Sequence, residues 1–203
     1  MKRFLVLSLA ALCVAALVPQ TLSAGVGLKG GFALSKFSVT DSGAPDFMNM
    51  PAPVGGLFFS FGLGPLSIQP EIFYARMGAK SEFEGATLKY QLDYVYAPVL
   101  LKMKVIPAGP VRPVIFAGGY YSYLLNAKGV MTFEGETEEG DLDDMFKKSD
   151  YGVVGGVGLE FKLPGILFTI EGRYNFGLAN IAAEGEEGEG KNRSMMALVG
   201  IAF

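Results

Sequence analysis

Alternation of apolar and polar side chains along most of the chain is the feature that most constrains its fold. In the last segment, Met195, Ala197, Val199, Ile201 and Phe203 occupy every second position. Because successive side chains of a strand point to opposite faces, such a pattern indicates a strand with one apolar face. We identify eight segments of this kind, each long enough to cross a bilayer as a tilted strand, at 26–35, 54–63, 66–76, 89–105, 113–125, 150–163, 166–178 and 193–203.

The connections between these segments alternate in length. Three are short and rich in proline and glycine, at 64–65, 106–112 and 164–165, and four are longer and polar, at 36–53, 77–88, 126–149 and 179–192. Bacterial outer-membrane barrels have short periplasmic turns and longer extracellular loops. The pattern therefore predicts an all-β fold, an eight-stranded antiparallel up-and-down transmembrane barrel with both termini on the periplasmic side.

The N-terminal segment has the organisation of an export signal. Lys2 and Arg3 precede an apolar run over 4–18, and small residues close the segment 19–24. The alternative is a single membrane anchor, but the run is short for a span of about 20 residues. We therefore expect 1–24 to be a cleaved secretory signal peptide and 25–203 to be one barrel domain located in the outer membrane.

Composition excludes several classes of function. The chain has 17 Lys and Arg against 20 Asp and Glu, so removal of Lys2 and Arg3 leaves 15 against 20 and a net charge of −5. An acidic chain of this kind disfavours nucleic acid as a partner. The sequence contains no histidine, and its single cysteine, Cys13, lies in the expected signal. Nucleophilic schemes and metal sites that depend on these residues are excluded, and we expect no enzyme and no cofactor.

Outward aromatic residues are expected to mark the two membrane interfaces. Tyr74, Tyr151 and Tyr174 fall at the long-loop side, and Phe161, Phe168 and Phe203 at the short-turn side. Two aromatic girdles are typical of a transmembrane barrel. The rival fold is a soluble sandwich or lipocalin-like barrel, which would leave a large apolar belt exposed to water.

The polar face of the predicted strands carries charges of both signs. Eight strands enclose a space just wide enough for side chains to fill, and desolvated charges need partners. We expect a polar network in the lumen, formed by Lys29, Glu71, Lys102, Glu160, Glu171 and Arg173. The functional alternative is a proton or ion path or a binding site, whereas an open nutrient pore does not fit this strand number.

Two long connections are strongly acidic. Segment 126–149 contains Asp141, Asp143 and Asp144, which are weak candidates for a divalent cation site. They lack the glycine and the terminal glutamate of an EF-hand loop. A solvated acidic surface is the simpler interpretation, and weak cation binding shared with lipopolysaccharide phosphates is the alternative.

Several segments resemble the PorT-like outer-membrane β-barrel family, in order and over nearly all of 25–203. They include "LSIQPEIFYARMG", "LDYVYAPVLLKMK", "DMFKKSDYGVVGGVGLEF" and "IEGRYNFGLANI". The resemblance implies an eight-stranded outer-membrane barrel, with no catalytic residues, and a connection to protein secretion for the named member. The expected role is structural or accessory in envelope assembly or secretion, and the alternative is a barrel that binds a small ligand or cation.

The expected partners follow from the location in the envelope. They are outer-membrane lipid and lipopolysaccharide, the barrel-assembly machinery during biogenesis, and envelope or secretion proteins. Phe203, an aromatic residue that ends the last alternating segment, is expected to serve as the C-terminal signal for barrel assembly.

Overall fold

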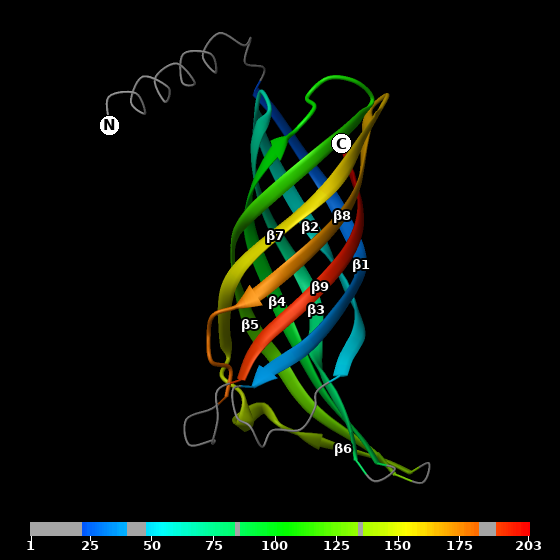
Figure 1. The fold of residues 1–203 in the computed structure, drawn as a ribbon, viewed down its shortest axis with the longest axis vertical. Coiled ribbons are helices and arrows are strands. Elements are labelled where there is room, and N and C mark those ends of the chain that lie inside the picture. Colours follow the sequence, from blue (N-terminus) through cyan, green and yellow to red (C-terminus); the bar gives the residue numbers. More distant parts are fainter. Residues whose placement is uncertain (1–21, 40–47, 84–85, 134–135, 183–189) are drawn as a thin grey trace, which may run out of the picture.

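The computed structural model describes residues 22–39, 48–83, 86–133, 136–182 and 190–203. Nine antiparallel strands form one sheet that closes on itself (Figure 1). The strands are β1 (Leu22–Val39), β2 (Met48–Leu63), β3 (Leu66–Phe83), β4 (Ala86–Lys104), β5 (Val111–Phe133), β6 (Glu136–Asp141), β7 (Ser149–Leu163), β8 (Ile166–Gly177) and β9 (Gly190–Ala202). A short 3₁₀ helix, Asp143–Met145, follows β6. Residues 1–21 of the expected signal peptide lie outside the described residues.

Eight of these strands form the ring. Around the ring the strands follow the order β1, β2, β3, β4, β5, β7, β8, β9, and each pairs with the next. The ring closes where β1 pairs with β9, from Gly27↔Ala202 to Val39↔Gly190. Strand β6 pairs with β5 alone among the described strands and stands outside the ring. The predicted eight-stranded barrel is therefore confirmed, with one additional strand.

The prediction of long loops is wrong for two segments, which contain paired strands. Segment 77–88 continues β3 and β4 as a paired hairpin up to Phe83↔Ala86, and segment 126–149 contains the end of β5 and all of β6. The physical reason is that backbone N–H and C=O groups still pair beyond the apolar belt, where lipid no longer imposes apolar alternation on the outer face. These strands project from one end of the barrel, at the bottom of Figure 1.

The opposite end has the tight connections. Gly64 and Gly165 adopt φ values of +61° and +77° in the turns between β2 and β3 and between β7 and β8. Positive φ is easily accessible only to glycine, and such residues suit two-residue hairpin turns. The first and last described residues of the barrel also lie here. We call this side of the barrel the short-turn end and the opposite side the long-loop end.

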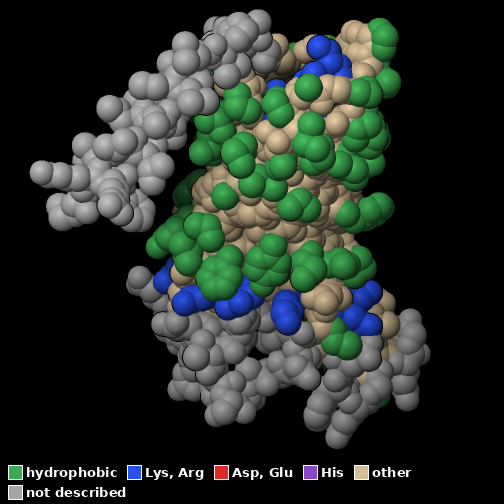
Figure 2. Space-filling view, turned by 45° about the horizontal axis from the view of Figure 1, so that its top comes forward, with side chains coloured by type: hydrophobic (Ala, Val, Ile, Leu, Met, Phe, Trp, Pro, Cys, Tyr) green, Lys and Arg blue, Asp and Glu red, His purple; other side chains and the backbone are tan. Residues whose placement is uncertain are grey.

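The outer wall of the barrel is apolar. Leu28, Phe32 and Val157 are 52, 66 and 63% exposed, and the three predicted outward tyrosines are also exposed. Figure 2 shows apolar side chains over the wall and a band of Lys and Arg where the wall meets the long-loop end. No helix in the described part of the chain has the length and hydropathy to span a bilayer.

Large aromatic side chains fill the interior where glycine faces them. A Cβ on Gly27 would lie 2.5 Å from the Phe58 ring, and one on Gly156 would lie 2.6 Å from the Phe116 ring. Interiors are close-packed, so the glycines on the inward face make the space that these rings occupy. The aromatic residues and the charged cluster together leave little open lumen.

Candidate functional site

Six charged side chains meet in the middle of the barrel, and we call them the lumen cluster. Lys29 comes from β1, Glu71 from β3, Lys102 from β4, Glu160 from β7, and Glu171 and Arg173 from β8. All six are at most 5% exposed as residues. Successive side chains of a strand point to opposite faces, and the neighbours of each of these residues face the outer wall, so the six side chains point inward.

Arg173 joins the two carboxylates at the centre of the cluster. It donates through Nη1 to Glu71 Oε2, and through Nη2 to Glu71 Oε1 at 2.9 Å and to Glu171 Oε2 at 2.5 Å. Lys29 Nζ donates to Glu71 Oε1 at 2.8 Å and to both oxygens of Glu171, at 2.8 and 2.9 Å. Charge-assisted bonds of this kind are short and geometrically specific, so the cluster holds its members in one arrangement.

Lys102 extends the cluster toward the short-turn end. Its Nζ lies 2.8 Å from Glu171 Oε1 and 3.4 Å from Glu160 Oε1. The cluster thus balances three cations against three carboxylates. Balance matters because an unpaired charge in a desolvated interior is strongly destabilising.

Aromatic faces complete the packing around the cations. Lys29 Nζ lies 4.5 Å from the Phe58 centroid, and Arg173 Cζ lies 5.4 Å from that of Phe116 and 5.7 Å from that of Phe73. Cations are attracted to the negative face of a ring at these distances. The cluster and its rings span the barrel from β1 and β2 to β5 and β8, and so close the lumen.

A second polar group lies between the cluster and the long-loop end. Tyr96 Oη donates to Asn175 Oδ1 at 2.8 Å, and Asn175 Nδ2 donates to Ser194 Oγ at 2.9 Å. Asn192 Nδ2 donates to Asp150 Oδ2 at 3.0 Å. Sequence reasoning missed Asp150, Asn192 and Ser194 as inward residues. Their alternation was the only available signal, and it is weak at strand ends.

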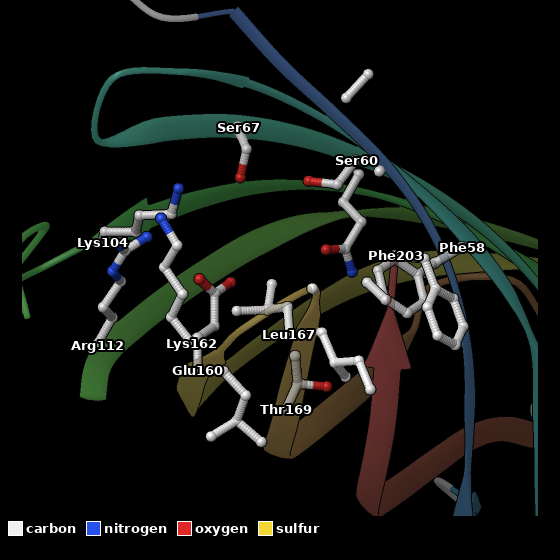
Figure 3. A pocket seen from close by; sticks show the side chains of 17 residues that line it. Phe58, Ser60, Ser67, Lys104, Arg112, Glu160, Lys162, Leu167, Thr169 and Phe203 are labelled. Carbon is white, nitrogen blue, oxygen red and sulfur yellow. The ribbon is translucent and has the colours of Figure 1, made fainter. Parts of the chain in front are cut away.

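A pocket of about 310 Å³ opens at the short-turn end (Figure 3). Lys104, Arg112 and Lys162 lie together on one side of it, beside the carboxylate of Glu160. Glu160 and Thr169 form its floor, and the Glu160 Oε2 and Thr169 Oγ1 atoms are buried with no hydrogen-bond partner among the described residues. The sequence analysis assigned Arg112 to a turn and did not predict this pocket.

The three candidate cation ligands in segment 126–149 do not form a metal site. Asp143 uses both oxygens for protein donors, since Oδ1 accepts from the Ala127 N–H at 2.6 Å and Oδ2 accepts from Lys148 Nζ at 2.7 Å. Asp141 Oδ1 accepts from the Asp143 N–H at 2.9 Å. Within the described ranges, no three acidic, histidine or cysteine side chains gather to hold a metal; Asp141 ends β6, and Asp143 and Asp144 begin the short 3₁₀ helix.

The Asp143 contacts predict a pH dependence of this loop. Hydrogen bonds from Lys148 and from the Ala127 N–H lower the pKa of the Asp143 carboxyl below its usual value of about 3.9. A lowered folded-state pKa stabilises the loop above the usual value, and the contribution is lost as pH falls through the lowered one. We expect the Ala127 amide resonance to titrate with a midpoint below 3.9, and Asp143→Asn to abolish that titration. An unshifted midpoint would contradict the Asp143–Lys148 geometry.

Beyond the ring, β3 to β6 continue as a projecting sheet at the long-loop end. All six residues of β6, Glu136–Asp141, are exposed, and β6 is the edge of the sheet. A cavity of about 300 Å³ lies on this sheet, lined by Leu88, Met131, Leu142, Glu138 and Glu139 among others. The projecting sheet therefore presents an acidic edge next to an apolar hollow.

Comparison with known proteins relates the chain to outer-membrane barrels. The family model described as outer membrane protein β-barrel domain matches residues 19–183. Neisserial surface protein A shares 12% identity at a TM-score of 0.51, covering 90% of this chain and 97% of that one. Among curated proteins, none matches the chain.

Two further solved structures share the barrel at lower similarity. Ail, the attachment invasion locus protein of Yersinia pestis, is 14% identical at a TM-score of 0.45, with 89% of this chain and 99% of that one covered. The N-terminal β-barrel domain of OprF from Pseudomonas aeruginosa is 10% identical at 0.46, with 90 and 98% covered.

Proposed function

The chain belongs to the outer membrane protein β-barrel domain family, and on that premise we propose that it is a closed, non-enzymatic barrel that anchors the projecting sheet outside the cell. The barrel lies in the outer membrane, with the short-turn end toward the periplasm. Its role would be accessory, in envelope assembly or secretion, through contacts of the projecting sheet with other envelope or secreted proteins. The PorT-like resemblance of the sequence supports this role.

The lumen cluster is the observation that carries the proposal. Six buried charged side chains cross the barrel from wall to wall. Ion pairs with N···O distances of 2.5–3.4 Å join them. A barrel filled in this way provides a rigid support and no passage. What remains available for partners is the projecting sheet, whose strands are held by backbone pairing up to Phe83↔Ala86 and Phe133↔Glu136.

Sequence content supports the absence of catalysis. The chain has no histidine and one cysteine, at position 13, and nucleophilic schemes normally need one of these residues. The Glu71 and Glu171 carboxylates of the lumen cluster accept hydrogen bonds from Lys29, Lys102 and Arg173, which occupies the oxygens that acid–base chemistry would use.

Contact with lipopolysaccharide is supported by the basic band at the long-loop end. Lys36 on β1 and Arg193 on β9 are direct cross-strand neighbours on the outer wall, and Lys191 lies on the same face of β9. Figure 2 shows Lys and Arg gathered at this level. Like charges directly opposite are unfavourable, so an anionic group placed between Lys36 and Arg193 would relieve the repulsion. Phosphates at the membrane surface have this charge.

Replacement of the hairpin tips tests the accessory role. A variant in which residues 79–90 and 128–142 are each replaced by an Asn-Gly turn keeps the ring pairing of β4 and β5 over Asp93–Lys104. We expect it to fold, as shown by a mobility change on boiling in a cold gel, and to lose envelope-protein crosslinks that the unaltered chain forms. A matched control replaces the periplasmic turn 106–110 instead and should keep them. Unchanged crosslinks in the tip variant would refute the proposal.

A binding barrel is the second candidate, favoured by the cavity on the projecting sheet. Glu138 and Glu139 border this cavity, and Leu88 and Met131 supply apolar surface. A small organic cation fits this combination better than a bare metal ion. Spermidine should then raise the temperature at which the backbone amides of the projecting sheet lose their protection from hydrogen exchange, since ligands stabilise the state they bind. Replacement of both carboxylates, Glu138→Gln with Glu139→Gln, should remove this effect.

A further inference from the structure

The pocket at the short-turn end has the chemistry of a ligand site rather than of a structural ion pair. Lys104, Arg112 and Lys162 border it from β4, β5 and β7, as does the last residue, Phe203, and Glu160 is the one acidic side chain among its lining residues. That carboxylate is already shared with Lys102 at 3.4 Å. Among the described residues, no ion pair is found for Lys104, Arg112 or Lys162, so positive charge is in excess at the mouth of the pocket.

Strand register explains why these groups converge. Arg112 pairs with Glu160 across β5 and β7, and Glu160 pairs with Thr169 across β7 and β8. The three side chains therefore follow one another around the inner wall at the same level. Gly200 continues the row on β9, where a Cβ would lie 2.8 Å from Thr169 Oγ1. A glycine at this position leaves room for the Thr169 and Lys29 side chains.

The backbone holds the mouth in place. Lys104 N–H donates to the Pro65 carbonyl at 2.8 Å and Lys162 N–H to the Pro110 carbonyl at 2.7 Å. Arg112 Nε donates to the Gly109 carbonyl at 3.2 Å. These bonds tie two of the short connections to the strands that carry the cations. The backbone that carries the positive rim is thus preorganised, which lowers the cost of binding.

Two buried polar atoms without hydrogen-bond partners indicate the chemistry of a ligand in the pocket. Glu160 is 5% exposed and Thr169 is 2% exposed, yet Glu160 Oε2 and Thr169 Oγ1 find no partner among the described residues. Buried polar atoms are normally hydrogen-bonded. A carboxylate oxygen requires a donor, and a threonine hydroxyl can accept or donate. A hydroxyl-bearing ligand would satisfy both atoms.

We propose that this pocket binds a small phosphorylated polyol, with its phosphate between Lys104, Arg112 and Lys162 and its hydroxyl groups on Glu160 and Thr169. A volume of about 310 Å³ is at the lower end of the range for small-ligand sites, which suits a group of the size of phosphoglycerol. That chemistry is available as a free metabolite and as the headgroup of a phospholipid in the periplasmic leaflet. The site lies at the opposite end of the barrel from the projecting sheet and is independent of the accessory role.

Calorimetric titration of the refolded barrel with glycerol 3-phosphate tests the proposal, with inorganic phosphate and glycerol as comparison probes at constant ionic strength. We expect glycerol 3-phosphate to bind about tenfold more tightly than phosphate, because only it fills the floor, and glycerol not to bind. Lys104→Gln with Lys162→Gln should weaken binding at least tenfold, and Thr169→Val about fivefold. Lys128→Gln, on the projecting sheet, removes an exposed charge far from the pocket and should leave binding unchanged.

Titration in nanodiscs distinguishes the two sources. If the headgroup is the ligand, phosphatidylglycerol nanodiscs should abolish glycerol 3-phosphate binding and phosphatidylcholine nanodiscs should not. If the free metabolite is the ligand, binding should persist in both. The proposal is overturned if glycerol 3-phosphate fails to bind the lipid-free barrel, if phosphate binds equally well, or if Lys104→Gln with Lys162→Gln binds as the unaltered chain does.

Discussion

Replacement of Arg173 by methionine is expected to lower the free energy of unfolding by about 3–5 kcal/mol, the range for breaking a buried ion pair from one side. Arg173 donates to both Glu71 and Glu171 in the lumen cluster. Without it, three carboxylates face two cations, and the excess negative charge stays buried. The sequence contains no tryptophan, so urea unfolding is best followed by the fraction of folded band on a cold gel.

The paired variant separates charge balance from packing. Arg173→Met with Glu71→Gln restores two cations against two carboxylates, and we expect it to recover at least half of the loss. Lys162→Met, which removes a cation exposed at the pocket mouth, is the matched control and should change stability by less than about 1 kcal/mol. A single variant as stable as the unaltered chain would show that the lumen cluster does not hold the barrel together.

Gly31→Ala is expected to destabilise the barrel by about 3 kcal/mol, the upper part of the usual range for overpacking. Gly31 lies on β1 opposite Leu198 of β9, the pair of strands that closes the ring. A Cβ at this position would lie 1.9 Å from the Ala197 carbonyl oxygen. The obstacle is backbone, so no side-chain rotation removes it, and the closing strands have to separate.

The neighbouring glycine provides the control for this substitution. A Cβ on Gly30 would lie 3.7 Å from the Val54 carbonyl oxygen, an ordinary contact. Gly30→Ala should therefore be neutral or slightly stabilising, because alanine loses less backbone entropy on folding. Urea midpoints of the two variants, measured side by side, check the prediction. Equal midpoints would contradict the close approach of β1 and β9.

The alternation of side chains was sufficient to predict the ring, its topology and its apolar wall. It failed beyond the membrane, where Lys80↔Lys89 and Lys128↔Asp141 pair in strands that mix charged and apolar side chains. Hydrophobic periodicity has no signal there, since nothing is buried in lipid. Strand pairing at such positions depends on backbone hydrogen bonds, which the residue types do not encode.

The members of the lumen cluster followed from parity, but their partners did not. Parity put Lys29, Glu71 and Arg173 inside, whereas their convergence depends on the stagger between strands, which the sequence pattern does not specify. The basic pocket shows the same limit. Arg112 and Glu160 are neighbours only through the register of β5 and β7, and the turn-rich segment before Arg112 concealed the start of its strand.

Ion conductance of the purified barrel in a planar lipid bilayer tests the central claim, that the lumen is closed by its own side chains. The lumen cluster, with Phe58, Phe73 and Phe116 around its cations, predicts insertion without steady current at any moderate voltage. Folded protein, verified by a mobility change on boiling, must be present in the same membranes. Reproducible current steps of an open channel from that protein would contradict the account.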